Sequence, residues 1–288
     1  MSSSFTVDYV MMLKPININL SDSHVMAIIN LTPDSFYGAS RRGSEAEARR
    51  AIEQAVSDGA TIVDLGGYSS RPGAQEVDVE EEWSRVRMGL QAARDAECDV
   101  VVSIDTFRSE VVRRAYEEFG DFIVNDISAG ELDESMVMEV ARLGLPYIAM
   151  HMKGDPKSMQ SLTNYNGGVV ADVCDYLSRR GEELQRAGIL RENIVLDPGF
   201  GFAKTVEQNF QLMKGLDSVR ALGYPLLIGV SRKSMIYKTL GLTSEESLPG
   251  SLALAWEALR GGNAIIRVHD VAATRQVMEL CKYYNELR

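Results

Sequence analysis

The sequence predicts an α/β protein that folds as a single (β/α)8 barrel, the TIM-barrel architecture. Short apolar runs recur along the chain, and seven of them lead into Asn, Asp, Arg, Lys or His. Such runs are typical of strands that are buried on both faces of a parallel sheet. Amphipathic helical patterns separate the runs, and a length of 288 residues suits one barrel. A doubly wound open sheet is the alternative fold.

The apolar runs place the strands. We expect them at residues 26–29, 62–65, 100–104, 122–124, 147–150, 194–196, 226–228 and 264–266. Before them, residues 5–22 alternate apolar and polar side chains around Lys14-Pro15-Ile16-Asn17, which predicts a β-hairpin. We therefore expect an N-terminal hairpin over residues 1–22, plugging the amino end of a barrel formed by residues 23–288.

The helical patterns fall between these strands. They cover residues 44–56, 80–94, 108–119, 169–187, 205–213, 252–259 and 271–287. Capping boxes, formed by Ser44 with Glu47 and by Thr205 with Gln208, mark two of the helix starts.

Composition excludes several classes of protein. The net charge is −11, from 30 basic and 41 acidic residues, whereas a general nucleic-acid binder requires a basic face. No apolar run approaches the about 20 residues that span a bilayer, and Met1-Ser2-Ser3-Ser4 lacks the layout of a signal peptide. The three cysteines form neither a metal-binding spacing nor a disulfide framework. These features predict a cytoplasmic protein that binds small molecules.

The polar residues at the strand ends define one candidate site, because the carboxyl ends of parallel strands meet at one end of a barrel. They are Asn30, Asp105, Asn125, Asp197, Lys233, Arg267 and His269, with Arg71 on a glycine- and proline-rich loop. The cations could hold a phosphate or diphosphate, and Asn30 could offer an oxygen to a magnesium ion. The carboxylates and Asn125 could bind a flat, nitrogen-rich heterocycle.

Each of these residues also has an ordinary structural interpretation. Asn at a strand end is often a turn or cap residue, and Asp197-Pro198-Gly199 alone is turn chemistry. We interpret His24 as structural and His151 as lying near the site. The joint occurrence of the polar groups at one end of one barrel favours the functional interpretation.

Several of these segments together resemble the bacterial dihydropteroate synthases, a family of pterin-binding enzymes. The resemblance rests on residues 30–36, 66–73, 103–106, 124–127, 150–152, 196–202, 231–234 and 267–270. It implies a transferase of folate biosynthesis that joins 6-hydroxymethyl-7,8-dihydropterin diphosphate to 4-aminobenzoate, giving 7,8-dihydropteroate and pyrophosphate. It also implies a homodimer and a sulfonamide target.

The resemblance assigns roles to individual residues. It implies that the pterin is held by Asp105, Asn125, Asp197 and Lys233, with Arg267 over its face. It implies that the diphosphate meets Asn30, Arg71, Arg267 and His269, with Mg²⁺ on Asn30. It implies that 4-aminobenzoate is bordered by Phe36, Ser70, Pro72, Lys233 and Ser234. The catalytic residues would be Asp105, Lys233 and Arg267.

Two positions depart from the family pattern, and two other functions compete. Tyr68 stands where the family commonly has Glu, and Ser70 where it commonly has Thr, which leaves the packing around 4-aminobenzoate open. One alternative is the methyltetrahydrofolate-binding domain of a corrinoid methyltransferase, which shares a pterin-binding barrel but needs no grip on a diphosphate. The other is a catalytically silent barrel that binds a pterin or phosphate.

Overall fold

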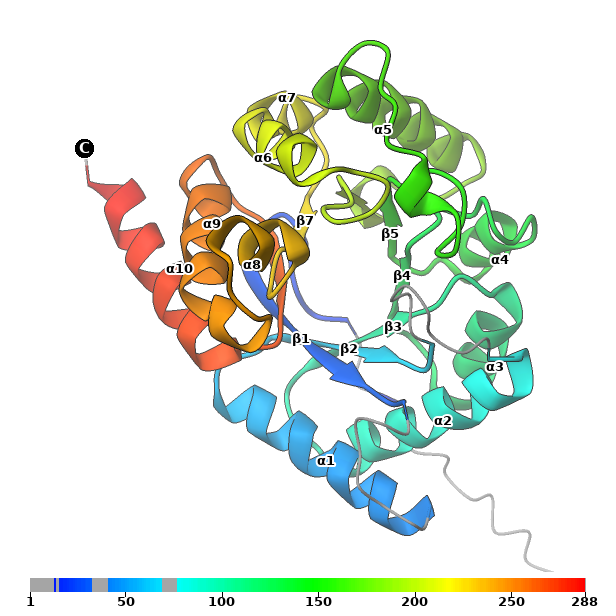
Figure 1. Cartoon of the computed structure of the whole chain (residues 1–288). Coiled ribbons are helices and arrows are strands. Elements are labelled where there is room, and N and C mark those ends of the chain that lie inside the picture. Colours follow the sequence, from blue (N-terminus) through cyan, green and yellow to red (C-terminus); the bar gives the residue numbers. More distant parts are fainter. Residues whose placement is uncertain (1–12, 14–15, 33–40, 69–76, 288) are drawn as a thin grey trace, which may run out of the picture.

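A computed structural model describes residues 13, 16–32, 41–68 and 77–287, and within them eight parallel strands surround one central axis (Figure 1). The strands are β1 (His24–Asn30), β2 (Ile62–Gly66), β3 (Val101–Asp105), β4 (Ile123–Asp126), β5 (Tyr147–Met150), β6 (Ile194–Asp197), β7 (Leu227–Ile228) and β8 (Ile265–Val268). They pair in the order β6-β5-β4-β3-β2-β1-β8-β7. A parallel bridge between Leu196 and Leu226 joins the two ends of this sheet. The predicted barrel is confirmed.

Helices surround the strands on the outside (Figure 1). They are α1 (Arg41–Ser57), α2 (Val79–Asp95), α3 (Ser109–Phe119), α4 (Met136–Leu143), α5 (Val169–Arg186), α6 (Val206–Lys214), α7 (Leu216–Arg220), α8 (Ser234–Leu240), α9 (Leu248–Arg260) and α10 (Val271–Glu286). Short 3-10 turns occupy Met159–Ser161, Arg191–Asn193 and Glu245–Ser247. The capping box of Thr205 with Gln208 is confirmed. The box predicted at Ser44 is wrong, because α1 already begins at Arg41.

The inside of the barrel begins with an apolar layer near the amino ends of the strands, which we call the barrel floor. Each strand contributes one buried residue to it: Met26, Ile62, Val101, Ile123, Ile148, Val195, Leu227 and Ile265. This layer matches the packed interior expected of an eight-stranded barrel, so the polar groups above it stand on a closed base.

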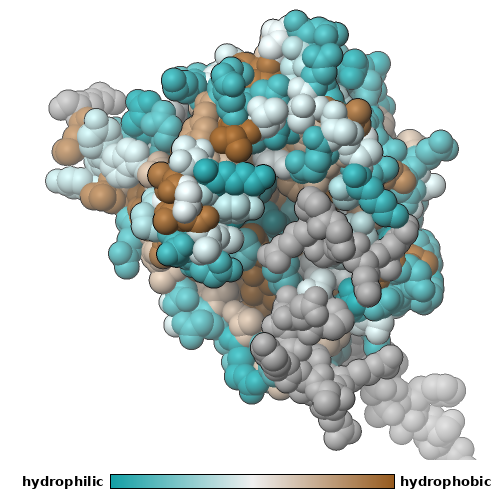
Figure 2. All heavy atoms as spheres, viewed as in Figure 1, coloured by the Kyte–Doolittle hydropathy of each residue, from teal (hydrophilic) through white to brown (hydrophobic). Residues whose placement is uncertain are grey.

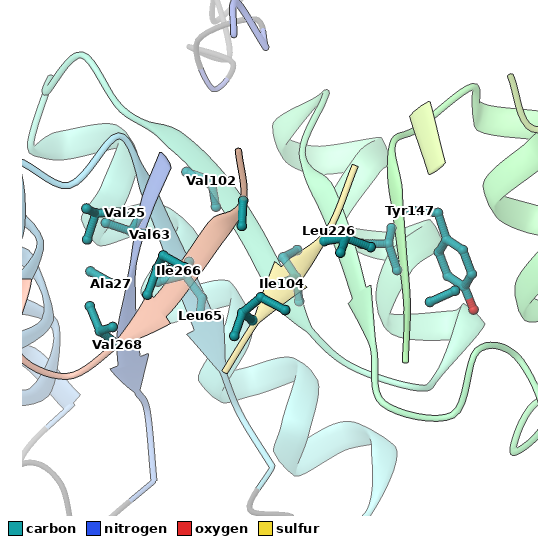
Figure 3. Close-up of a cluster of buried hydrophobic side chains, with 14 of the residues drawn as sticks. Val25, Ala27, Val63, Leu65, Val102, Ile104, Tyr147, Leu226, Ile266 and Val268 are labelled. Atoms are coloured by element: carbon teal, nitrogen blue, oxygen red, sulfur yellow. The ribbon is translucent and has the colours of Figure 1, made fainter. Parts of the chain in front are cut away.

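The outer core lies between the strands and the helices. Its strand residues alternate in sequence with those of the floor, as a two-residue period requires. Figure 3 shows four of these outer-core residues, Val25 and Ala27 of β1 and Val63 and Leu65 of β2. Both faces of the sheet are therefore buried, which explains the continuous apolar runs in the sequence.

The hairpin prediction is not confirmed. Its first arm lies outside the described residues, and residues 16–22 form no strand. Leu20 is buried against the barrel floor, with Ile16 and Ile18 partly buried beside it. The segment therefore covers the amino end of the barrel without the predicted strand pairing. The boundary at residue 22 between hairpin and barrel stays a prediction.

On the face in Figure 2, hydrophilic residues cover most of the helices and hydrophobic residues form small groups. Within the described ranges, no helix is both long and apolar enough to cross a membrane.

Candidate active site

The inner face of the barrel becomes polar immediately above the floor. Residues two positions apart in a strand share a face. Two positions after a floor residue stand Asp64, Ser103, Asn125, Asp197 and Arg267. Asn30 and Asp105 stand four positions after Met26 and Val101, at the carboxyl ends of their strands. The alternation of the strands therefore brings the predicted polar residues to one end of the barrel.

Arg267 connects the polar residues of four strands. Its Nε donates to Oδ2 of Asp64 at 2.6 Å, and its Nη2 donates to Oδ2 of Asp105 at 2.8 Å. Nδ2 of Asn125 donates to the same Asp64 oxygen at 3.0 Å. Asp64 is fully buried, while the side chains of Asp105 and Arg267 are each 22% exposed. The guanidinium is thus held between two carboxylates beside an amide.

Asp64 is a site residue that the sequence analysis missed, because it lies inside an apolar run instead of at its end. The signal that could have found it is its two-residue spacing from Ile62. Its Oδ1 and Oγ of Ser103 are buried, and neither has a hydrogen-bond partner among the described residues. Buried polar atoms without partners are uncommon, so this layer is suited to a polar ligand.

Burial raises the pKa of Asp105 to about 7, with Arg267 lowering it and the charge of Asp64 raising it. A negative charge close by disfavours the ionised form of a carboxyl, and a cation close by favours it. The charge on Asp105 therefore changes near neutral pH.

Asp197 ends β6, and Lys233 lies between β7 and α8. Oδ1 of Asp197 accepts from the backbone N–H of Gly199 at 2.7 Å, and burial raises the pKa of Asp197. Nζ of Lys233 donates to the carbonyl of Phe200 and lies 4.8 Å from the centre of the Phe202 ring. Burial lowers the pKa of Lys233 to about 8, although Asp197 opposes this shift.

His269 is exposed and is oriented by Ser231, a second residue that the sequence analysis did not assign. The Ser231 hydroxyl accepts from the backbone N–H of His269 at 3.2 Å and lies 3.0 Å from Nδ1 of its ring. The neighbouring Arg232 instead forms an ion pair with Asp270 at 2.7 Å, so it supports the loop.

Asp126 follows Asn125 but has a structural role. Its oxygens accept from the Ser128 backbone at 2.7 Å, from Gly130 at 2.7 Å and from the Tyr147 hydroxyl at 2.6 Å. It is fully buried, and these bonds shape the turn after β4.

The other two histidines are buried. His24 lies at the start of β1 and bonds to Thr61 and to the carbonyl of Asn19, which confirms its structural interpretation. His151 follows β5 and contacts Lys204 at 2.9 Å.

Some predicted site residues are only partly placed. Phe36, Ser70, Arg71 and Pro72 lie outside the described residues. Ser234 begins α8, beside Lys233, and is half-buried. In the part of the chain that the structure describes, no group of three His, Cys, Asp or Glu side chains could hold a metal ion.

Tyr68, one of the two departures from the family pattern, is packed at the edge of the site. Its ring meets Phe107 edge-on at 5.2 Å, and the Arg108 guanidinium lies 5.8 Å from its centre. Arg108 pairs with the buried Glu82, so Tyr68 lies near a cation that a carboxylate neutralises.

The sequence is similar to those of known pterin-binding enzymes. A family described as "Pterin binding enzyme" matches residues 26–269. A dihydropteroate synthase of Escherichia coli (strain K12) is 42% identical over 92% of this chain and 92% of its own length. One from Synechocystis sp. is 41% identical over 90% of this chain and 89% of its own. The chain belongs to the dihydropteroate synthase family.

Solved structures of dihydropteroate synthases share the fold. The Yersinia pestis enzyme, solved with a sulfonamide drug, has 35% identity and a TM-score of 0.86, covering 95% of this chain and 98% of its own. The Xanthomonas albilineans enzyme, solved with 4-aminobenzoic acid, has 35% identity and a TM-score of 0.85, covering 93% and 95%. This member of the dihydropteroate synthase family is therefore a transferase of folate biosynthesis, and the methyltransferase alternative is set aside.

Proposed function

We propose that the carboxyl end of this barrel binds 6-hydroxymethyl-7,8-dihydropterin diphosphate and 4-aminobenzoate and joins them through the polar layer above the floor. The observation that carries this proposal is the placement of Arg267 between Asp64 and Asp105, beside Asn125. A related enzyme from Xanthomonas albilineans has been solved in complex with 7,8-dihydropteroate, which supports the same ligand class here.

The pterin ring is held by groups that complement its donors and acceptors. The bond from Asn125 Nδ2 to Asp64 fixes the orientation of the amide, because a carboxylate can only accept. Asn125 therefore presents Oδ1 as an acceptor for the amino edge of the heterocycle. Asp197 accepts from the ring nitrogens, Lys233 donates to the ring oxygen, and Arg267 covers the ring face.

The diphosphate meets Arg267, His269 and Arg71. Because the Ser231 hydroxyl accepts from the His269 backbone, its own proton can be given to Nδ1 of the ring. The His269 ring that accepts this hydrogen bond at Nδ1 carries its own proton on Nε2. Nε2 can therefore donate to a phosphate oxygen. These donors offset a net charge of −11 that otherwise disfavours an anionic substrate.

The residues at the end of β1 fit a magnesium ion held mainly by the substrate. Magnesium often keeps several waters and takes only one or two protein ligands together with phosphate oxygens. Asn30 ends β1 beside Gly66 and offers one such hard oxygen. When bound there, magnesium would neutralise charge on the leaving pyrophosphate.

The reaction exchanges one bond for another at the pterin methylene. The bond from carbon to the diphosphate oxygen breaks, and its electron pair leaves with pyrophosphate. The resulting cation is delocalised into the dihydropterin, and ionised Asp105 stabilises it. The amine of 4-aminobenzoate then attacks the methylene carbon and releases a proton to water. Positioning and electrostatics provide the catalysis, so no nucleophilic His or Cys is required.

The 4-aminobenzoate pocket joins the pterin pocket at Lys233 and Ser234. Phe36, Ser70 and Pro72 complete its wall in this proposal. A sulfonamide would compete with 4-aminobenzoate there.

Pyrophosphate release tests the proposal. The purified chain should release pyrophosphate from the pterin diphosphate when 4-aminobenzoate and Mg²⁺ are present, and dihydropteroate should form in equal amount. Binding of the pterin diphosphate without release would instead indicate a silent pterin-binding barrel. Methyl transfer from methyltetrahydrofolate would support the methyltransferase alternative.

We also propose that the chain forms a homodimer through α10. The end of this helix projects beyond its neighbours (Figure 1), and Leu280, Tyr283 and Tyr284 on it are 56–63% exposed. Large apolar side chains gathered on one element favour an interface.

We place the reaction in the cytoplasm, because the three cysteines are free thiols, as in a reducing compartment.

A further inference from the structure

Lys204 is a buried lysine that the reaction described above does not use. Only 5% of it is exposed, and it lies in the segment between β6 and α6. Its Nζ makes contacts of 2.9 Å to Nδ1 of His151, 2.9 Å to the carbonyl of Gly199 and 3.0 Å to the carbonyl of Phe202. Burial lowers the pKa of Lys204 to about 7, although Asp197 opposes this shift. In its ammonium form the group has three protons, so each of these acceptors can receive one.

His151 completes this cluster from the neighbouring strand. It is 2% exposed, and its ring meets Tyr176 edge-on at 4.9 Å. Burial and the charge of Lys204 lower the pKa of His151 to about 2, so its ring is neutral. A neutral ring can accept from Lys204 at Nδ1. The histidine is therefore a fixed acceptor for the lysine and has no need to contact the substrate.

The segment that Lys204 holds has an unusual backbone. Gly199, Gly201 and Ala203 all have positive φ, at 70°, 83° and 50°. A Cβ at Gly199 would lie 2.0 Å from the carbonyl oxygen of His151, so only glycine fits there. Ala203 adopts the left-handed region without being glycine. Such a backbone persists only where surrounding contacts hold it.

Other contacts hold the same segment from the outside. Oδ1 of the buried Asn209 accepts from the backbone N–H of Gly201 at 2.7 Å, and the Tyr165 hydroxyl donates to the carbonyl of Ala203 at 2.9 Å. Lys204 adds the inner contacts, since two of its acceptors are carbonyls of this segment.

This segment forms one wall of the pterin site. The Gly199 N–H donates to Asp197, and the Phe200 carbonyl accepts from Lys233. Both partners are residues to which we assign pterin binding. A change in the path of residues 198–203 would therefore move the groups that set the orientation of Asp197 and Lys233.

We propose that Lys204 is a positioning residue for pterin binding, which fixes residues 198–203 through His151, Gly199 and Phe202 and so orients Asp197 and Lys233. The inference rests on the proposed roles of those two residues. The charge of Lys204 also favours the ionised form of Asp197, because Coulombic attraction from Lys204 lowers the pKa of that carboxyl against the effect of burial.

The decisive measurement is the affinity for the pterin diphosphate, obtained by calorimetric titration without 4-aminobenzoate. Lys204→Met keeps an unbranched side chain that is one atom shorter, and it removes the charge and the donors. We expect its Kd to rise at least tenfold. Lys204→Arg keeps the charge and several donors and should recover part of the loss. His151→Phe removes one acceptor and should weaken binding less than Lys204→Met.

Arg191→Met is the matched control. Arg191 also donates to two loop carbonyls, those of Leu222 at 3.2 Å and Gly223 at 2.9 Å, but it lies before β6 at the opposite end of the barrel. It should change thermal stability without changing the pterin Kd.

Asp197→Asn separates failure of this inference from failure of the site. If Asp197→Asn leaves the pterin Kd unchanged, the proposed pterin site is wrong. If Asp197→Asn weakens binding while folded Lys204→Met binds as the parent does, only the positioning role is overturned. Should Lys204→Met not fold, the decision passes to Lys204→Arg and His151→Phe, and parental pterin affinity in both would overturn the role.

Discussion

At the scale of single residues, the site depends on how charges share partners. Arg267 is bound by two carboxylates, and only Asp105 of the two is partly exposed. Asp64 holds Arg267 and Asn125 in place, while Asp105 lies at the strand end, where the substrate enters. Asp64 and Asp105 therefore have different roles, because they lie in successive layers of the barrel.

The role of Asp105 is tested by Asp105→Asn. The amide keeps the shape of the side chain but removes the charge that stabilises the developing pterin cation. We expect turnover to fall by about two orders of magnitude, the scale of one lost preorganised contact. Steady-state kinetics on a variant with the parental circular dichroism spectrum checks this. Turnover within a few-fold of the parent would contradict the role.

The pH dependence of the reaction follows from the same carboxyl. Burial raises the pKa of Asp105 to about 7, so the group is protonated below that pH and ionised above it. If the ionised form is needed, kcat/KM for the pterin diphosphate should rise with pH through about 7. It should fall again above about 8, where Lys233 loses the proton that it donates to the pterin.

Asp64→Asn provides the control for this pH profile. The charge of Asp64 raises the pKa of Asp105, so removing it should move the acid limb to lower pH. The substrate titrates identically with both enzymes, and a shift between them must come from the protein. Superimposable acid limbs would show that Asp105 does not control the profile.

The sequence predicted those site residues that immediately follow an apolar run. Asn125, Asp197 and Arg267 are of this kind, and each faces the inside of the barrel. Asp64 was missed because it interrupts a run, and Lys204 because its three partners come from two loops that only the fold brings together. A contact of that kind leaves no local pattern in the sequence.

At the scale of elements, the loop that positions Asp197 is continued by a well-capped helix. The Thr205 hydroxyl accepts from the Gln208 backbone at 3.1 Å, and the Gln208 side chain accepts from the Thr205 backbone at 2.9 Å. α6 thus begins at a fixed residue directly after Lys204.

Thr205→Ala tests the contribution of this cap. Loss of the hydroxyl leaves the Gln208 N–H without its acceptor, and we expect the free energy of unfolding to fall by about 0.5–2 kcal/mol. Urea unfolding followed by circular dichroism measures this change. Thr205→Ser, which keeps the hydroxyl, should lie within a few tenths of a kcal/mol of the parent, and equal losses in both variants would argue against the cap.

Element prediction succeeded where the periodicity was long. The strands and the long helices carry clear patterns, whereas α4, α7 and α8 were not predicted, since each has too few turns to show one. The hairpin prediction relied on alternation at Ile16, Ile18 and Leu20. Those side chains do face the barrel floor, but alternation alone cannot show whether a segment pairs with another strand or lies across an apolar surface.

At the scale of the whole molecule, the apolar layer that stabilises the barrel and the polar layer that binds the substrate occupy different levels along the barrel axis. The floor joins all eight strands near their amino ends, and the polar layer lies above it. The apolar runs predicted this architecture because a closed parallel sheet buries both faces of every strand. The oligomeric state depends instead on exposed residues, so the apolar runs of the buried strands do not predict it.

The proposed homodimer is the prediction at this scale. Leu280 and Tyr283 on α10 are 61% and 63% exposed, and a stable interface commonly buries about 800 Å² on each partner. The double substitution Leu280→Glu with Tyr283→Glu places like charges opposite each other in a symmetric contact. We expect sedimentation to change from dimer to monomer while the circular dichroism spectrum stays parental. Leu190→Glu, at a leucine that is 60% exposed beside the 3-10 turn before β6, should leave the dimer intact. A dimer that survives the double substitution would place the interface on another surface, because two buried glutamates facing their symmetry mates could not be accommodated at α10.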